Sequence, residues 1–291
     1  MPKRVALVLS GGGAKGAFQV GAEKYAREVK GYRWSVISGV SIGALNGAYL
    51  AMENYDRLLE IWQTITTEKV FGRPRTWNII GRIVRGKPSF FDAARFRPYF
   101  DEVDPGAMTV DLLVGAVSLV TGEYRLFRPG DPGFTRALLA SAALPPLLPP
   151  VTVGAGVTDM IDGGARCAWP LGDVLETDPD EIVLLNCAAP ASLPIETAPK
   201  AALLISQRAF EIAMHELYEN DIRQFRRLNR LVEQAATAGV TLCDANGRPY
   251  RNIPLTVIEP DDRLGETVDF SQTNIRRSLD AGWEKAKKIL G

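Results

Sequence analysis

The first fifty residues contain two copies of one pattern, in which a short apolar run reaches a glycine-bearing turn and then a helix-forming stretch. The first copy has an apolar run at residues 4–10 and a predicted helix over residues 17–28. The second has its run at residues 34–38 and a predicted helix over residues 42–52, which is rich in alanine and leucine. Two such units in succession predict parallel strands with helices packed on the sheet. We therefore expect an α/β protein.

The rest of the chain continues this mixture of strands and helices. The further predicted elements are a hairpin over residues 111–120 and 122–127, a helix over 134–144 that Pro145 and Pro146 terminate, strands at 181–186 and 255–258, and helices at 199–238 and 274–290. Residues 71–100 differ, because arginine, proline, glycine and aromatic residues follow there without a period. We expect one domain over residues 1–291, with residues 71–100 as an inserted lid.

The charge balance limits the classes of partner. The chain carries 34 basic and 34 acidic residues among 291, so its formal net charge is zero. No global field then draws it to nucleic acid or to acidic membranes, and a charge-driven partner has to meet a local patch. We expect no nucleic-acid partner, and no sequence feature predicts an oligomeric state.

The expected compartment is the cytoplasm, with peripheral contact at membranes left open. The apolar run before Ser10 is too short for the core of a signal peptide, and no apolar stretch reaches transmembrane length. Three cysteines, Cys167, Cys187 and Cys243, are odd in number, widely spaced and without metal-ligand spacing. They are expected to be buried free thiols in a reducing compartment.

Ser41 lies in the sequence Gly39-Val-Ser-Ile-Gly43, between the second predicted strand and its helix. A serine hydroxyl becomes a good nucleophile when it is exposed near a base and near donors that stabilise an oxyanion. Gly39 and Gly43 allow the sharp strand-to-helix turn of a nucleophile elbow, which provides that exposure. The alternative is a small turn that only packs a helix onto the sheet. We predict that Ser41 attacks an ester carbonyl.

The glycine-rich loop Ser10-Gly-Gly-Gly-Ala-Lys-Gly16 follows the first strand. Its backbone N–H groups, together with the following helix N-terminus, can bind a negative oxygen. Gly11, Gly13 and Gly16 also fit a dinucleotide fingerprint, but residues 31–52 lack the acidic ribose ligand that this fingerprint expects. A phosphate loop would need Ser or Thr after Gly-Lys, and the order here is Lys15-Gly16-Ala17. An oxyanion hole is favoured, in which Lys15 either assists an anionic headgroup or lies in solvent.

The base is expected to be a carboxylate. The single histidine, His215, lies in the middle of a long predicted helix, where a structural role is favoured over a catalytic one. Asp162, in Asp162-Gly-Gly164, is the strongest candidate because the glycines allow a tight turn, and Asp159 is its nearby competitor. Partial desolvation can raise the proton affinity of such a carboxylate.

Three motifs in order, Gly11-Gly-Gly-Ala-Lys-Gly16, Gly39-Val-Ser-Ile-Gly43 and Asp162-Gly-Gly164, resemble those of the patatin-like phospholipase family. The resemblance implies a three-layer α/β/α fold with a mostly parallel sheet and lipid acyl hydrolase activity. It also implies a Ser41–Asp162 dyad without histidine. It assigns the oxyanion hole to the loop of Gly11, Gly12, Gly13, Lys15 and Gly16.

Residues 140–150, Ala-Ser-Ala-Ala-Leu-Pro-Pro-Leu-Leu-Pro-Pro, resemble the family segment that borders the active site. Two positions depart from the family pattern. Leu148 replaces a usual aromatic residue, and Ala168 stands before Trp169-Pro170 where the family often has asparagine. The support around the base is therefore expected to differ.

The expected reaction is hydrolysis of a lipid or lysophospholipid ester through an acyl-enzyme, without metal or cofactor. Gly12 and Gly13 would supply the oxyanion N–H groups. The arginine, tryptophan and isoleucine residues within positions 71–87 suit a lid that touches anionic headgroups, and a solvated loop is the alternative. Transacylation to an acceptor and a catalytically silent lipid- or nucleotide-binding module stay open as other functions.

Overall fold

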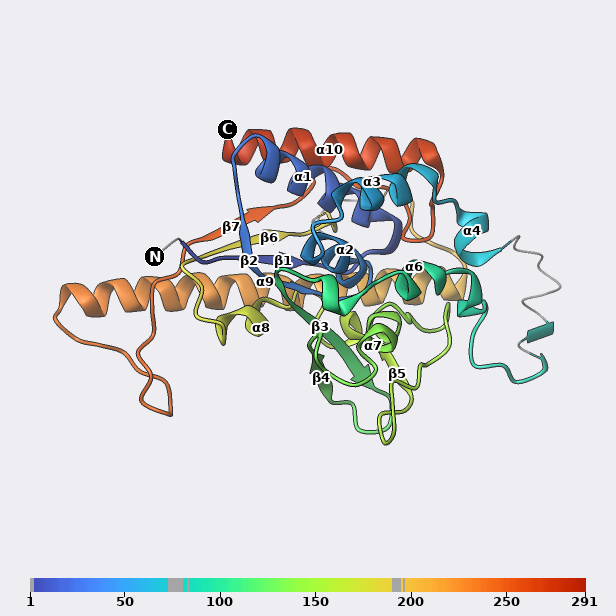
Figure 1. Cartoon of the computed structure of the whole chain (residues 1–291), viewed down its shortest axis with the longest axis horizontal. Coiled ribbons are helices and arrows are strands. Elements are labelled where there is room, and N and C mark those ends of the chain that lie inside the picture. Colours follow the sequence, from blue (N-terminus) through green and yellow to red (C-terminus); the bar gives the residue numbers. More distant parts are fainter. Residues whose placement is uncertain (1–2, 73–80, 83, 190–194, 196) are drawn as a thin grey trace.

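The computed structural model describes residues 3–72, 81–82, 84–189, 195 and 197–291 (Figure 1). Its strands are β1 (Val5–Leu9), β2 (Trp34–Gly39), β3 (Asp111–Ser118), β4 (Tyr124–Phe127), β5 (Met160–Asp162), β6 (Glu181–Leu185) and β7 (Leu255–Ile258). Its helices are α1 (Ala17–Glu28), α2 (Ile42–Ala51), α3 (Tyr55–Thr64), α4 (Thr67–Phe71), α6 (Pro98–Asp101), α7 (Phe134–Ser141), α8 (Leu171–Leu175), α9 (Ala202–Thr237) and α10 (Gln272–Leu290). Short 3₁₀ turns are η1 (Gly13–Gly16), η2 (Ala93–Arg95), η3 (Pro105–Ala107) and η4 (Gly163–Ala165).

The described strands form one mostly parallel sheet with the order β4-β3-β2-β1-β6-β7 (Figure 1). Neighbours from β3 to β7 pair in parallel, whereas β4 and β5 both run antiparallel to β3. The two strand–turn–helix units expected at the start of the chain are β1-η1-α1 and β2-α2, and both are confirmed. Strands β3 and β4 confirm the predicted hairpin.

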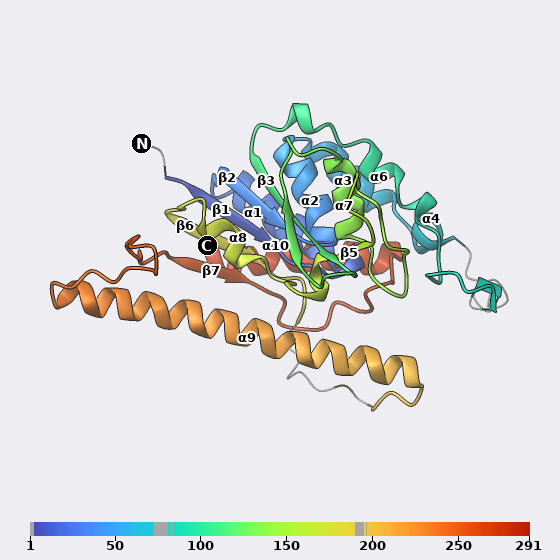
Figure 2. The ribbon, with the colours of Figure 1, turned by 90° about the horizontal axis from the view of Figure 1, so that it is seen from below.

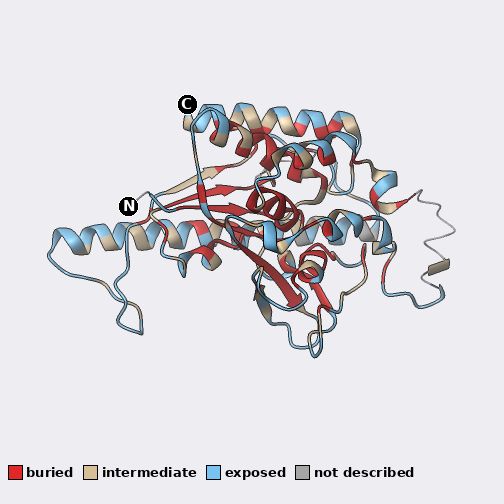
Figure 3. Cartoon of the chain, in the orientation of Figure 1, coloured by how far each residue is buried: buried red, intermediate tan, exposed pale blue. Residues whose placement is uncertain are grey.

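Both faces of the sheet are covered, which gives three layers. Along β1, Leu7 and Leu9 face a core with α1, α2, α3 and α10, whereas Ala6 and Val8 face a second core with α8 and α9. Figures 1 and 2 show α1 and α10 on one face and the long α9 across the other. Buried residues make up most of β1, β2, β3 and β6 and the inner faces of these helices (Figure 3). A strand buried on both faces needs a continuous apolar run, as in the Val5–Leu9 sequence.

Two sequence expectations need correction. Helix α7 ends at Ser141, before the predicted end at residue 144. In a continued helix the carbonyls of Ser141 and Ala142 would accept the N–H groups of residues 145 and 146, and both of these are prolines. The Ala143 carbonyl instead accepts the Asp162 N–H at 3.1 Å. Burial of all three cysteines was also wrong, since Cys187 is buried, Cys167 is intermediate and Cys243 is exposed.

None of the described helices combines the length and the apolar character that crossing a membrane requires. Within the predicted lid, residues 73–80 and 83 lie outside the described residues. The described parts include the end of α4, η2 and α6. Phe71, Phe90 and Phe96 from this region line the pocket described below. The prediction of a lid therefore stays a prediction.

Candidate active site

Ser41 lies at the tight turn between β2 and α2, with φ 56° and ψ −129°. A positive φ is uncommon for a residue with a side chain, and a strained serine at this kind of turn projects its hydroxyl away from the sheet. The flanking glycines are required by close approach. A Cβ on Gly39 would lie 2.5 Å from the Gly43 carbonyl oxygen, and one on Gly43 would lie 2.5 Å from the Leu9 carbonyl oxygen.

Asp162 reaches Ser41 through the pairing of β3. Strands β4 and β5 both pair with Ala116 and Val117, so they lie on opposite edges of β3. Strand β5 therefore shares the edge of β3 that β2 occupies. Gly39 pairs with Val114 and Asp162 with Ala116, so Asp162 lies two positions beyond the end of β2. The chain turns through Ser41 at this point.

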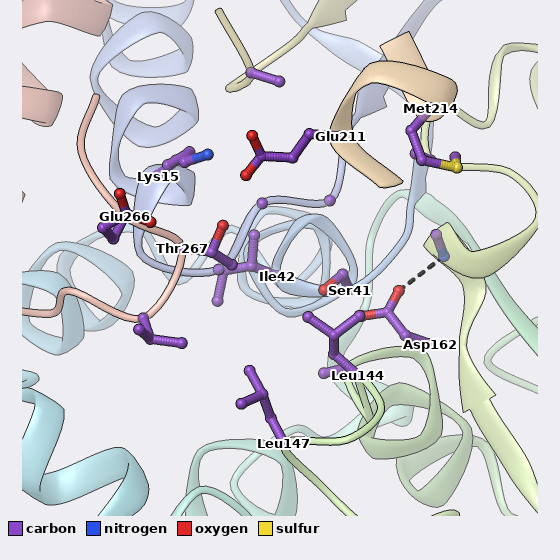
Figure 4. A pocket seen from close by; sticks show the side chains of 18 of the residues that line it. Lys15, Ser41, Ile42, Leu144, Leu147, Asp162, Glu211, Met214, Glu266 and Thr267 are labelled. Carbon is purple, nitrogen blue, oxygen red and sulfur yellow. Dashed lines mark hydrogen bonds between the residues drawn. The ribbon is translucent and has the colours of Figure 1, made fainter. Parts of the chain in front are cut away.

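The Asp162 carboxyl is buried, with 2% exposure, and it is the N-cap of η4. Its Oδ1 accepts the Gly164 N–H at 2.7 Å (Figure 4). Desolvation by burial raises the pKa of Asp162 from 3.8 to about 6, although hydrogen bonds with the Ser41 side chain and the Gly164 N–H each lower it. The competing carboxylate, Asp159, is exposed in the turn before β5.

The glycine loop has some N–H groups already bonded and others available. The N–H groups of Gly11 and Ala14 donate to the carbonyls of Ala168 and Thr267, and Lys15 N–H donates to the Gly12 carbonyl. Those of Gly12 and Gly13 precede the first donor within η1 and have no acceptor among the described residues. Oxyanion binding would therefore fall to Gly12 and Gly13.

Close packing behind the loop explains its glycines. A Cβ on Gly12 would lie 2.4 Å from Cys187 Sγ, and one on Gly13 would lie 2.3 Å from the Thr267 carbonyl oxygen. A Cβ on Gly11 would approach the Ser41 Cβ to 3.2 Å. A side chain at Gly11, Gly12 or Gly13 would therefore displace the N–H groups or crowd the serine.

Ser141, at the end of α7, is a site residue that sequence reasoning did not single out. Its hydroxyl oxygen accepts the Ser41 backbone N–H at 3.0 Å, and the side chain is completely buried. The bond ties the strained turn to the end of α7. The segment at residues 140–150 had been expected to border the site, but the partner of Ser141 depends on a pairing one hundred residues away.

Ser41 and Asp162 line a pocket of about 980 Å³ (Figure 4). Apolar side chains contribute much of its wall, including Val70, Phe71, Phe90, Phe96, Leu147, Leu148 and Phe270. Charged groups enter from the loop and from α9, and Figure 4 shows Lys15 and Glu211 pointing into the space. The pocket can therefore hold a long apolar group with a polar group attached.

His215 lines this pocket from α9, where its Nε2 lies 3.6 Å from Glu219 Oε1. Among the described residues, neither Ser41 nor Asp162 has a hydrogen bond or ion pair with it. Its assignment as structural stays a prediction. Among the residues that the structure describes, no group of three or more His, Cys, Asp or Glu side chains lies close enough together to bind a metal ion.

Comparisons with known proteins found a relative in sequence and a solved structure with a similar fold. A patatin-like phospholipase domain-containing protein from Caenorhabditis elegans is 28% identical over 192 residues, which are 60% of this chain and 14% of that protein. The crystal structure of VipD from Legionella pneumophila shares the fold, with a TM-score of 0.50 and 16% identity over 99% of this chain and 67% of that chain.

The family model described as Patatin-like phospholipase matches residues 7–175, more than half of the chain. The match includes the glycine loop, the Ser41 turn and Asp162, and it stops at the end of α8. The chain belongs to the patatin-like phospholipase family.

Proposed function

We propose that this protein is a serine lipid acyl hydrolase of the phospholipase A, lysophospholipase or esterase type, and that Ser41 and Asp162 form its catalytic dyad. Membership of the family supports lipid hydrolysis in general. The observation that carries the finer proposal is the strained Ser41 turn beside a buried carboxylate, with two unbonded backbone N–H groups in the same pocket.

The proposed reaction begins with transfer of the Ser41 hydroxyl proton to Asp162 as Oγ attacks the ester carbonyl carbon. The carbonyl oxygen becomes an oxyanion, which the Gly12 and Gly13 N–H groups stabilise. Collapse of this intermediate breaks the ester bond, and the leaving alcohol takes the proton from Asp162. Water then attacks the acyl-enzyme with Asp162 as base, and a free fatty acid leaves while Ser41 regains its proton.

Burial gives Asp162 a suitable proton affinity for this role. A carboxyl with an ordinary pKa of 3.8 is a weak base at neutral pH, whereas one with a pKa of about 6 accepts a proton more readily and is still mostly ionised there. The Gly164 N–H holds one carboxylate oxygen, so the carboxyl keeps a fixed orientation toward Ser41.

The pocket supports an acyl-lipid substrate. Its aromatic and aliphatic wall would bury an acyl chain, with a gain of about 0.8 kcal/mol for each buried CH₂ group. Lys15, Arg208 and Glu211 also line the pocket, and they would meet a polar or charged headgroup. Peripheral contact with a lipid surface follows from such a substrate and belongs to the proposal.

Labelling with a fluorophosphonate probe tests this function directly. The probe should phosphonylate Ser41 in the parent protein, and peptide mass spectrometry should locate the adduct there. Incubation with a lysophospholipid should release fatty acid, and added alcohol acceptors reveal any transfer in place of hydrolysis. An inert Ser41 together with unchanged lipid would contradict the proposal and favour a silent binding module.

A further inference from the structure

A chain of three buried polar side chains connects the glycine loop to the helix that follows Ser41. Trp62 on α3 donates its Nε1–H to Asn46 Oδ1 at 2.9 Å. Asn46 on α2 donates to Gln19 Oε1 at 2.9 Å, and Gln19 on α1 donates to the Ser10 carbonyl oxygen at 2.8 Å. The three side chains are at most 1% exposed, and Ser10 is completely buried. Four segments of the fold, the glycine loop, α1, α2 and α3, therefore share one hydrogen-bonded chain.

The direction of this chain is fixed at both ends. An indole N–H can only donate, so Trp62 requires the oxygen of the Asn46 amide to face it. A backbone carbonyl can only accept, so Ser10 requires the nitrogen of the Gln19 amide to face it. The bond between Asn46 and Gln19 then has one arrangement that satisfies both ends. Rotation of either amide would leave buried groups without partners, which is costly.

Both ends of the glycine loop are bonded to this chain. The carbonyl oxygen of Ser10, the first residue of the loop, accepts from Gln19, while the carbonyl oxygen of Gly16, its last residue, accepts from Asn46 Nδ2 at 3.0 Å. Ser10 Oγ also accepts the Cys187 N–H at 3.0 Å, which holds the side chain that packs against Gly12. Asn46 lies about one turn into α2, the helix that begins directly after Ser41. The hydrogen-bonded chain thus connects the glycine loop to the helix that carries Ser41 at its N-terminus.

We propose that Gln19, Asn46 and Trp62 are positioning residues that set the distance between the Gly12 and Gly13 N–H groups and Ser41 Oγ. This inference rests on the proposed function, because it assigns those N–H groups to the oxyanion. A network that served stability alone could lie anywhere in the core. This one joins the two segments whose separation determines how well the transition state is bound, and errors of about 1 Å in such a separation can cost about a hundredfold in rate.

The test compares two tryptophan-to-phenylalanine variants. Trp62→Phe removes the donor to Asn46, whereas Trp34→Phe removes the corresponding bond from a buried indole to Glu23 Oε1, 3.0 Å long, at the start of β2 away from Ser41. With p-nitrophenyl butyrate as substrate, Trp62→Phe should lower kcat about tenfold with KM within about twofold. Trp34→Phe should leave kcat unchanged, even if its melting temperature falls as much as that of Trp62→Phe.

A second variant, Gln19→Met, breaks the middle of the chain and should lower kcat further, with slower fluorophosphonate labelling of Ser41. Amide hydrogen exchange supplies a readout independent of activity, because the bonded N–H groups of Gly11 and Ala14 should exchange faster in Trp62→Phe and Gln19→Met than in Trp34→Phe.

Unchanged kcat in both network variants of an active parent would overturn the positioning role and leave the proposed hydrolase intact. Equal kcat losses in Trp62→Phe and Trp34→Phe would also overturn it. A parent that neither hydrolyses the ester nor reacts with the probe would instead contradict the proposed function. In that case the exchange rates decide whether the network holds the loop, and unchanged rates overturn this inference as well.

Discussion

The structure contains two serine–aspartate pairs, whose serines are three positions apart in the sequence and whose aspartates are eleven positions apart. One is Ser41 with Asp162. In the other, the Ser38 hydroxyl donates to Asp173 Oδ2 at 3.1 Å, and the Tyr124 hydroxyl donates to the same oxygen at 2.8 Å. Burial raises the pKa of both carboxyls. Residue type and proton affinity therefore do not distinguish the pairs.

Backbone geometry and surroundings do distinguish them. Ser38 is a completely buried residue inside β2, and its φ is not among the positive values found in the described residues. Ser41 has a positive φ, and it shares its pocket with Asp162, Gly12 and Gly13, whereas Ser38 and Asp173 are absent from the described lining of that pocket. A hydrogen-bonded serine and carboxylate thus need an exposed turn and oxyanion donors before they can act on an ester.

Removal of each serine hydroxyl should separate the two pairs most strongly. Ser41→Ala should lower kcat by about a thousandfold or more, because the attacking atom is lost. Ser38→Ala should keep kcat within about threefold and cost about 1 kcal/mol of unfolding free energy for the lost hydrogen bond. Ester hydrolysis and urea unfolding of both variants provide the measurements. A large activity loss in Ser38→Ala with normal stability would contradict the contrast.

Neutral replacements of the two carboxylates should give the next largest difference. Asp162→Asn should lower kcat about a hundredfold to ten-thousandfold, the range for loss of a general base. Its amide oxygen can still accept the Gly164 N–H, and a buried charge is removed, so stability at pH 8 should be equal or higher. Asp173→Asn should leave kcat within a few-fold. Equal kcat losses in the two variants would show that the pairs are not distinct in function.

Titration of Asp162 should affect activity and folding stability in opposite directions. Hydrolysis requires the ionised carboxylate, so kcat/KM should fall below a pKa of about 6. The protonated form is favoured in the folded state, so its stabilising contribution is present below the ordinary pKa of 3.8 and is lost as pH rises through about 6. That interval corresponds to roughly 3 kcal/mol relative to Asp162→Asn.

Activity and stability should therefore change in opposite directions between pH 4 and pH 6. Asp173→Asn supplies the control, because it should keep the activity profile of the parent although the pKa of Asp173 is also raised by burial. Rate profiles and chemical denaturation at each pH provide the data. An activity profile that shifts in Asp173→Asn would mean that the second pair contributes to the reaction.

The sequence predicted the Ser41 turn and the elements that flank it well. Apolar runs that end in glycine are local signals, so β1, β2, α1 and α2 could be placed within a residue or two, and the Ser41 turn followed from them. The pairing of β3 with the three-residue β5 was not local. The two glycines after Asp162 identified it as a candidate base. Its position beside Ser41, however, depends on the pairing of β5 with β3 on the edge that β2 also occupies, just past the end of β2.

Supporting side chains were harder to predict, for the same reason. Ser141, Asn46 and Gln19 are ordinary helix residues in the sequence, and only their long-range partners give them a role. Ser38 and Asp173 form a pair without any motif. The sequence indicates that a polar residue will be buried only when its hydrogen-bond partner is close to it in the sequence. Here the partners come from other segments of the fold.

The smallest expected difference concerns one hydroxyl beside each pair. Ser141→Ala removes the acceptor of the Ser41 N–H, and Tyr124→Phe removes one donor to Asp173. Both should cost about 1 kcal/mol of unfolding free energy. Only Ser141→Ala should lower kcat, by about threefold to tenfold, because only its bond holds the strained turn that orients Ser41. If the two variants have matching unfolding curves, a difference in kcat can be attributed to the turn. Equal kcat values would show that β2 and α2 hold Ser41 without Ser141.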